Sequence, residues 1–241
     1  MRVLELWRYP VKSLQGERLA EAEVGALGIA GDRRWALFDR DTGLGLTARR
    51  VPELLWGAAR VRPDGGVEVV LPDGTVTGDE ADLSDWLGRR VELRAADEEG
   101  DVPPVYETPA DEEVPDPTEW LQWEGAPGPF HDSPRIRLSL VSTGTLGSWD
   151  RRRFRANVVL DGEGEDALKG QEAALGEVGL RFGVPIARCV MTTRPQPGGI
   201  ARDTSVLTTI HRERQGLLAV RAAVLAPGTV RVGDQLLPAA D

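Results

Sequence analysis

Cysteine and histidine are scarce in this 241-residue chain, which has one cysteine, Cys189, and two histidines. A single cysteine cannot form an internal disulfide, so we expect the reducing environment of the cytoplasm. A classical zinc site would have to rely on carboxylates and is therefore excluded. A Cys–His nucleophile pair would need Cys189 near His131 or His211, and nothing in their spacing indicates this.

Long apolar runs and net positive charge are also missing. No run approaches the roughly 20 residues of a membrane helix, and residues 1–13 do not resemble a secretory signal, so we expect no membrane association. The net charge of −10 argues against a nonspecific nucleic-acid partner, which needs a basic surface. The sequence has no P-loop, no G-x-S-x-G elbow, no H-E-x-x-H and no C-x-x-C.

Short segments rich in β-formers, separated by Gly, Pro and Asp turns, predict a mostly β fold. The segments of residues 1–94 predict a β-barrel or sandwich rather than βαβ units. A short helix is expected at residues 81–87, with Asp79 as its cap. Strands resume in residues 130–238, where only residues 144–152 and 165–170 suggest short helices.

Residues 95–129 are acidic and rich in proline, with few apolar anchors. This composition is typical of a long, irregular, solvated connection. The alternative is a docking segment for a basic partner, although such runs are usually only solvated. We therefore predict two β-rich parts, residues 1–94 and 130–238, joined by residues 95–129.

Cys189 lies next to Arg188, where a strand is expected to end before the turn of residues 195–199. A neighbouring guanidinium favours a thiolate, and thiolates are ligands for soft transition metals. A lone cysteine is also often a small buried hydrophobe. Both interpretations stay open on the local sequence alone.

Six motifs occur together in the order typical of one family. The whole set resembles MOSC proteins with a MOSC N-terminal β-barrel domain, of the type of the bacterial YcbX proteins and the mitochondrial amidoxime-reducing component. The motifs are residues 9–13 (YPVKS), 31–37 (GDRRWAL), 47–49 (TAR), 153–159 (RFRANVV), 187–193 (ARCVMTT) and 227–234 (PGTVRVGD).

The resemblance implies an N-terminal β-barrel-like domain, a C-terminal MOSC β-barrel with a few short helices, and a molybdenum–molybdopterin cofactor. It implies that Cys189 is the catalytic metal ligand and that a second set of residues binds the cofactor: Lys12, Ser13, Arg33, Arg155, Asn157 and Arg188. Such side chains suit a phosphate and a pterin edge. Ala187 departs from a serine of the amidoxime reducers, and residues 131–143 match a phosphate-contacting stretch only loosely.

The activity that the resemblance implies is the reduction of small N-hydroxylated compounds. The sequence has no flavin or iron–sulfur motif, so a separate redox protein is expected to supply the electrons. The alternatives are a sulfur carrier that uses Cys189 as a persulfide, a carrier of the cofactor, or a metal-free β domain. We further expect the motifs of both halves to converge on one pocket of positive local charge.

Overall fold

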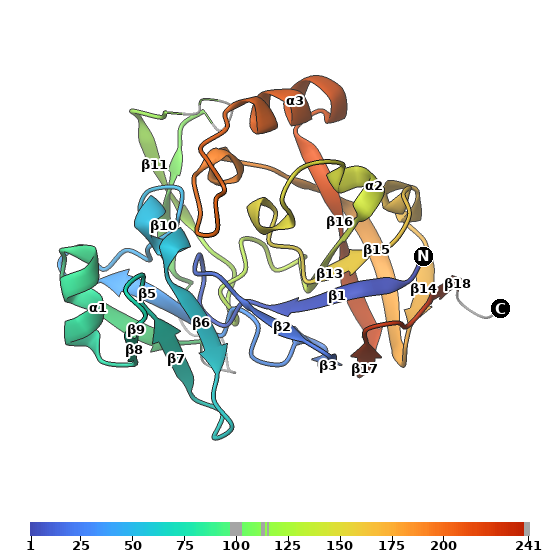
Figure 1. The fold of residues 1–241 in the computed structure, drawn as a ribbon, viewed down its shortest axis with the longest axis horizontal. Helices are drawn as coiled ribbons and strands as arrows, with labels where there is room; N and C mark the ends of the chain where they lie inside the picture. Colours follow the sequence, from blue (N-terminus) through green and yellow to red (C-terminus); the bar gives the residue numbers. More distant parts are fainter. Residues whose placement is uncertain (97–102, 112–113, 115, 239–241) are drawn as a thin grey trace.

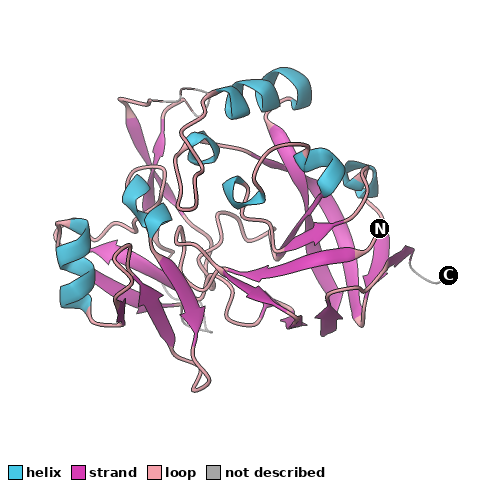
Figure 2. Cartoon of the chain, viewed as in Figure 1, coloured by secondary structure: helices cyan, strands magenta, loops and turns pink. Residues whose placement is uncertain are grey.

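The computed structural model describes residues 1–96, 103–111, 114 and 116–238. The fold is mostly β, with 40% strand against 17% helix, as predicted. Figure 1 shows the strands gathered into two groups, and Figure 2 separates strands from helices by colour.

The larger group is an eight-stranded sheet that curls into a half-barrel. All of its neighbouring strands are antiparallel except β12 and β13, which are parallel. Across the sheet the order is β18 (Leu236–Pro238), β14 (Glu172–Leu175), β15 (Val178–Ala187), β16 (Leu217–Ala226), β12 (Leu138–Ser142), β13 (Val158–Leu160), β1 (Val3–Arg8) and β2 (Glu17–Leu19). A small three-stranded sheet accompanies it, in the order β17 (Gly228–Arg231), β3 (Glu21–Gly25) and β4 (Gly28–Ile29).

Strand β12 is buried on both faces because the half-barrel is covered outside as well as filled inside. Leu138 and Leu140 point into the barrel core, whereas Val141 belongs to an outer apolar cluster. That outer cluster includes residues of α2 (Thr143–Leu146) and α3 (Ser205–Arg214). A strand with two apolar faces is held firmly, so β12 anchors the polar residues that follow it.

The smaller group of strands encloses a separate apolar core of residues such as Leu14, Leu37 and Leu54. Single β-bridges tie the loop after β1 to this group, at Val11–Trp35 and Gln15–Ala58. The elements of the group are β5 (Trp35–Asp39), η1 (Pro52–Trp56), β6 (Ala58–Val61), β7 (Val67–Val70), β8 (Val76–Thr77), α1 (Glu80–Leu87) and β9 (Val91–Ala95).

The expectation that residues 95–129 form a long irregular connection is wrong for part of that segment. Strands β10 (Val105–Pro109) and β11 (Trp120–Glu124) pair as a five-residue antiparallel hairpin. Tyr106 of β10 is fully buried between Phe38 and Trp123, with ring centroids 6.5 and 5.1 Å away. Aromatic packing against β5 therefore stabilises a hairpin that the acidic composition obscured. Residues 97–102, 112–113 and 115 lie outside the described residues.

Strand pairing crosses the boundary that the sequence suggested at residue 94. Strand β1 pairs with β13 in the half-barrel, and β3 pairs with β17 in the small sheet that accompanies it, so the first 25 residues pair with strands of the C-terminal part. The division into residues 1–94, 95–129 and 130–238 stays a prediction.

The predicted helix α1 is confirmed, including its cap, because the Asp79 side chain accepts a hydrogen bond from the Ala81 amide. Residues 144–152 and 165–170 form only short turns, namely α2, η2 (Arg151–Arg153) and η3 (Glu165–Leu168). Helix α3 was not predicted, because its threonines and β-branched residues have low helix propensity. None of the described helices combines the length and apolarity needed to cross a membrane.

Candidate functional site

A pocket between the half-barrel and the smaller group of strands contains most of the predicted site residues. Its empty space is about 670 Å³, including solvent at the mouth. The predicted convergence of motifs from both halves is confirmed. The residues that line the pocket are Lys12, Ser13, Arg33, Thr47, Ala48, Arg49, His131, Asp132, Ile136, Ser139, Phe154, Arg155, Ile186, Arg188, Cys189 and Met191.

Three of these residues have left-handed backbone conformations without being glycine. Ser13 has φ = 71°, Arg33 has φ = 52° and Arg155 has φ = 53°. Such conformations cost of order 1–3 kcal/mol and persist only where the surroundings impose them, which is frequent at functional sites. Backbone strain is therefore concentrated at this pocket, with only two other non-glycine residues of positive φ in the described chain.

The smaller group of strands contributes its wall through loops rather than strands. The Ser13 hydroxyl accepts a hydrogen bond from the Ala48 amide at 3.0 Å. Arg33 pairs with the buried carboxylate of Asp32 and donates to the Arg155 carbonyl at 3.1 Å. Asp32 also accepts from the Tyr9 amide at 2.7 Å. These bonds join the two loops that follow β1 and β4.

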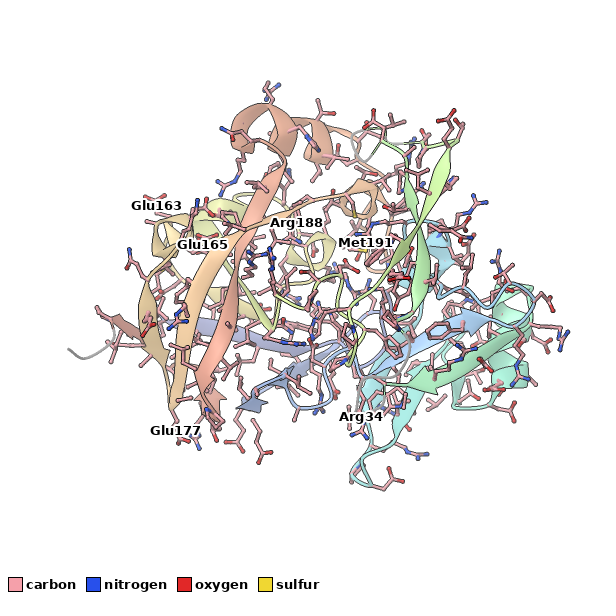
Figure 3. The ribbon with its side chains drawn as sticks, turned by 180° about the vertical axis from the view of Figure 1, so that it is seen from behind. Arg34, Glu163, Glu165, Glu177, Arg188 and Met191 are labelled. Atoms are coloured by element: carbon pink, nitrogen blue, oxygen red, sulfur yellow. The ribbon has the colours of Figure 1, made fainter. Side chains whose placement is uncertain are left out.

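The half-barrel contributes two arginines to the opposite wall, Arg155, which is buried, and Arg188, which is half-buried. Arg155 donates to the Leu14 carbonyl at 2.5 Å, and Arg188 donates to the carbonyls of Leu218 and Phe154 at 2.8 and 3.0 Å. Burial lowers the pKa of each guanidinium to about 10, so both remain cationic at neutral pH. Cys189 is half-buried beside Arg188, directly after β15 ends. Figure 3 labels Arg188 and Met191, which flank the cysteine in the sequence.

An ion pair occupies one end of the pocket. Lys12 is buried and donates to the Phe130 carbonyl at 2.9 Å and to Asp132 at 2.5 Å, while Arg49 contacts the same carboxylate at 3.3 Å. Burial lowers the pKa of Lys12, and Asp132 opposes that shift. Burial raises the pKa of Asp132, but Lys12 and Arg49 outweigh this and hold it well below its usual range. The Asp132 side chain is still 49% exposed, so solvent screens the pair.

The local charge is positive, as predicted. Five cationic side chains and one carboxylate line the pocket, although the whole chain carries a net charge of −10. His131 adds no charge, because burial lowers its pKa to about 3. The pocket therefore attracts anions against the overall field of the protein.

Four buried polar atoms on the pocket wall have no hydrogen-bond partner within the described residues. They are Thr47 Oγ1, His131 Nε2, Arg155 Nη2 and Arg188 Nη2. Unsatisfied buried polar groups are rare and costly, so each indicates a bound group or ordered water that would complete it. Two of them belong to cationic guanidinium groups, which favour an anionic oxygen.

Asn157 is not among the residues that line the pocket, contrary to the expectation, and its contact with the cofactor stays a prediction. Its amide oxygen accepts from the Ser139 amide and hydroxyl at 3.2 and 2.9 Å, and its amide nitrogen donates to the Trp7 carbonyl at 3.2 Å. In an extended strand, residues two apart share a face, but the left-handed Arg155 interrupts that alternation. Asn157 therefore supports Ser139, which does line the pocket.

Four residues of the pocket have no predicted role in the sequence. His131 and Asp132 lie in residues 131–143, which resemble a phosphate-contacting stretch of the family only loosely. Thr47 and Arg49 lie in the motif of residues 47–49, to which no role was assigned. The sequence signal for this stretch is that His131 and Asp132, two titratable residues, are adjacent. Their approach to Lys12 depends on the loop between β11 and β12, which the sequence does not place.

The residues of this pocket fit a molybdenum–molybdopterin cofactor. The Nη2 atoms of Arg155 and Arg188, which have no partner, suit its phosphate, and Thr47 and His131 suit a heterocycle edge. The described residues contain no group of three or more His, Cys, Asp or Glu side chains able to hold a metal. The chain therefore offers a metal one thiolate, that of Cys189, which fits a metal that is bound mainly by its own cofactor.

Comparison with known proteins gives relatives of low identity over most of the chain. Human mitochondrial amidoxime-reducing component 1 is 25% identical over 281 residues, covering 96% of this chain and 81% of the human protein. The mouse protein of that name is also 25% identical, with coverage of 96% and 80%. The crystal structure of the YuaD protein from Bacillus subtilis is similar over 98% of this chain and 93% of its own, with 11% identity. Its TM-score is 0.44.

Family models account for both halves of the pocket. The model of the MOSC N-terminal beta barrel domain matches residues 1–100 and contains Lys12, Ser13 and Arg33. The model of the MOSC domain matches residues 133–237 and contains Arg155 and Cys189. Because these two models match residues 1–100 and 133–237 in succession, the chain belongs to the MOSC family.

Proposed function

We propose that this protein is a molybdenum-cofactor-dependent oxidoreductase that reduces N-hydroxylated compounds. The observation that carries the proposal is the position of the only cysteine, at the wall of a cationic pocket with unpartnered buried donors. The relatives named amidoxime-reducing component support the substrate class, since an amidoxime is an N-hydroxylated compound. The expected cytoplasmic location stays a prediction.

In this proposal Cys189 is the protein ligand of the metal and the catalytic residue. Lys12, Arg33, Arg155 and Arg188 bind the anionic parts of the cofactor, because their charges lie within one partly desolvated pocket. Ser13 also binds the cofactor, and its hydroxyl is held in place by the hydrogen bond that it accepts from the Ala48 amide. When bound, the cofactor supplies two-electron redox chemistry, while the chain provides orientation, charge complementarity and shielding from water.

The overall reaction requires an external reductant. Converting an N–OH group to N–H releases one water molecule and consumes two electrons and two protons. We propose that a separate redox protein delivers these electrons, because the chain contains no flavin or iron–sulfur motif.

The test combines native mass spectrometry, elemental analysis and an assay of a simple amidoxime with an artificial electron donor. We expect stoichiometric molybdenum and reduction that depends on it. A mass increment of one sulfur atom on Cys189, without molybdenum, would instead indicate the sulfur-carrier alternative. A protein with neither feature would reject both proposals.

A further inference from the structure

The backbone that follows Cys189 is held by its own side chains. The turn η4 (Val190–Thr193) begins directly after the cysteine. The Cys189 carbonyl accepts two hydrogen bonds from Thr192, one from the amide and one from the hydroxyl, both at 3.0 Å. The orientation of the Cys189 peptide therefore depends on where Thr192 lies.

Thr192 is in turn bound by a buried arginine that does not line the pocket. Arg153 of η2 is 7% exposed and donates to the Thr192 carbonyl at 3.0 Å. The same guanidinium donates to the carbonyls of Arg194 and Ala201 at 3.4 and 2.7 Å. A planar guanidinium with three carbonyl partners fixes both the end of η4 and the returning loop, because its donors have a rigid geometry.

The other side of the same turn contacts the smaller group of strands. Met191 packs against the apolar core that contains Leu14 and Leu54. Arg153 therefore holds the turn from the half-barrel side, and Met191 holds it from the other side. The turn that carries Cys189 spans the junction between the two groups of strands, as its place in Figure 3 shows.

We infer that Arg153 is a positioning residue for Cys189, acting through the Thr192 carbonyl and the two hydrogen bonds from Thr192 to Cys189. This contact chain directs the thiol into the cationic pocket beside Arg188. The inference rests on the proposed function only for the identity of the group that the thiol binds. The orientation of the thiol is a property of the protein itself and is measurable without molybdenum.

The experiment compares two alkylating reagents on the metal-free full-length protein, which has no other cysteine. Iodoacetate is an anion and iodoacetamide is neutral, and in both cases the thiolate displaces iodide. The cationic pocket should favour iodoacetate when the thiol points into it. The ratio of the two rates therefore reports the direction of the thiol, whereas global stability is measured separately by thermal unfolding.

A matched pair of threonine variants tests the contact to Cys189. Thr192→Val removes the hydroxyl bond to the Cys189 carbonyl, and Thr193→Val removes an equivalent bond to the Val190 carbonyl at 2.8 Å. Both threonines are buried, so the substitutions are alike in volume and environment. We expect Thr192→Val to lower the iodoacetate preference about threefold or more, the scale of one hydrogen bond, and Thr193→Val to leave it unchanged.

A second pair tests the arginine. Arg153→Met should lower the preference further, and Arg153→Lys should restore part of it because one donor remains. Arg152→Lys is the control, since Arg152 donates to the Pro197 carbonyl and to Asp150 but not to η4. The rate ratio of Arg153→Met is compared with that of the parent once thermal unfolding shows that the variant is folded. If the variant does not fold, the comparison of Thr192→Val with Thr193→Val tests the inference.

Two results would overturn the inference. One is an Arg153→Met variant that unfolds at a lower temperature but keeps the parent rate ratio, which would make Arg153 purely structural. The other is an equal change in Thr192→Val and Thr193→Val. Neither result depends on whether the protein binds molybdenum, so a failure of the proposed function is distinguishable from a failure of this inference.

Discussion

The two walls of the pocket are built in different ways. The half-barrel wall places Arg188 and Cys189 where the long strand β15 ends. Its two arginines, the half-buried Arg188 and the buried Arg155, donate to carbonyl groups. The opposite wall consists of loops, in which Ser13 and Arg33 have left-handed backbones. Its strands belong to sheets of only two or three strands.

This difference separates two tasks. The half-barrel wall rests on an eight-stranded sheet with a large apolar core, which favours a fixed position for Cys189, the proposed metal ligand. The loop wall supplies charge to the pocket from shorter, locally strained segments.

The largest effect is expected for Cys189→Ser on the half-barrel wall. A hydroxyl is hard and poorly ionised compared with a thiolate, so molybdenum-dependent activity should fall by more than the roughly 10–100-fold typical of changes around a metal ligand. The half-buried site tolerates the small change in volume, so the thermal unfolding temperature should stay close to that of the parent. Activity equal to that of the parent would end the ligand hypothesis.

The next largest effect compares one arginine from each wall. Arg155→Ala and Arg33→Ala should each weaken cofactor binding by about 1.5–3 kcal/mol, the range of hydrogen bonds to charged groups. Arg155→Ala should have the larger effect, because it also leaves the buried Leu14 carbonyl without its 2.5 Å partner. The measurement is molybdenum content after purification, with Arg152→Ala as a control outside the pocket lining. Unchanged molybdenum in both variants would contradict these assignments.

A pH-dependent effect on stability is expected from His131, which lies between the walls. Burial lowers its pKa to about 3, whereas an unfolded histidine titrates near 6.5. Between these values the unfolded state binds the extra proton, so the free energy of unfolding should fall as the pH drops below about 6.5. The slope is about 1.4 kcal/mol per pH unit.

Urea unfolding at pH 6.5 and pH 5.0 checks this expectation. His131→Gln should remove the contribution of His131 to the pH dependence of the free energy of unfolding. Only the pH dependence that comes from carboxylates should then remain. If the variant and the parent lose stability equally over this interval, His131 is not the buried neutral group described here.

The smallest effect is expected for a contact that links the β10–β11 hairpin to the half-barrel side. Asp116 contacts Arg202 at 2.5 Å and Arg194 at 4.0 Å, but its side chain is 71% exposed. Exposed ion pairs contribute about 0–1 kcal/mol. Asp116→Asn should therefore change the free energy of unfolding by less than about 1 kcal/mol, as measured by urea unfolding. A larger loss would show that the hairpin is held by this pair rather than by Tyr106.

Local sequence signals predicted the elements whose stability is local. Helix α1 follows from the Asp79 cap and a run of helix-compatible residues, and the structure confirms both. The β10–β11 hairpin did not follow, because Tyr106 is stabilised by Phe38, a residue 68 positions earlier in the chain. Helix α3 did not follow either, because its buried residues Val206 and Ile210 are stabilised by packing within the outer cluster.

By itself, the sequence determined which chemical groups the protein carries: one thiol, few lysines, and arginines in motifs typical of the MOSC family. Only the tertiary structure decided which of these groups meet. It excluded Asn157 from the pocket and added Asp132 and His131 to it. The physical reason is that a residue's direction depends on the backbone around it, and the left-handed turn at Arg155 is imposed by contacts with Leu14, more than 140 residues away.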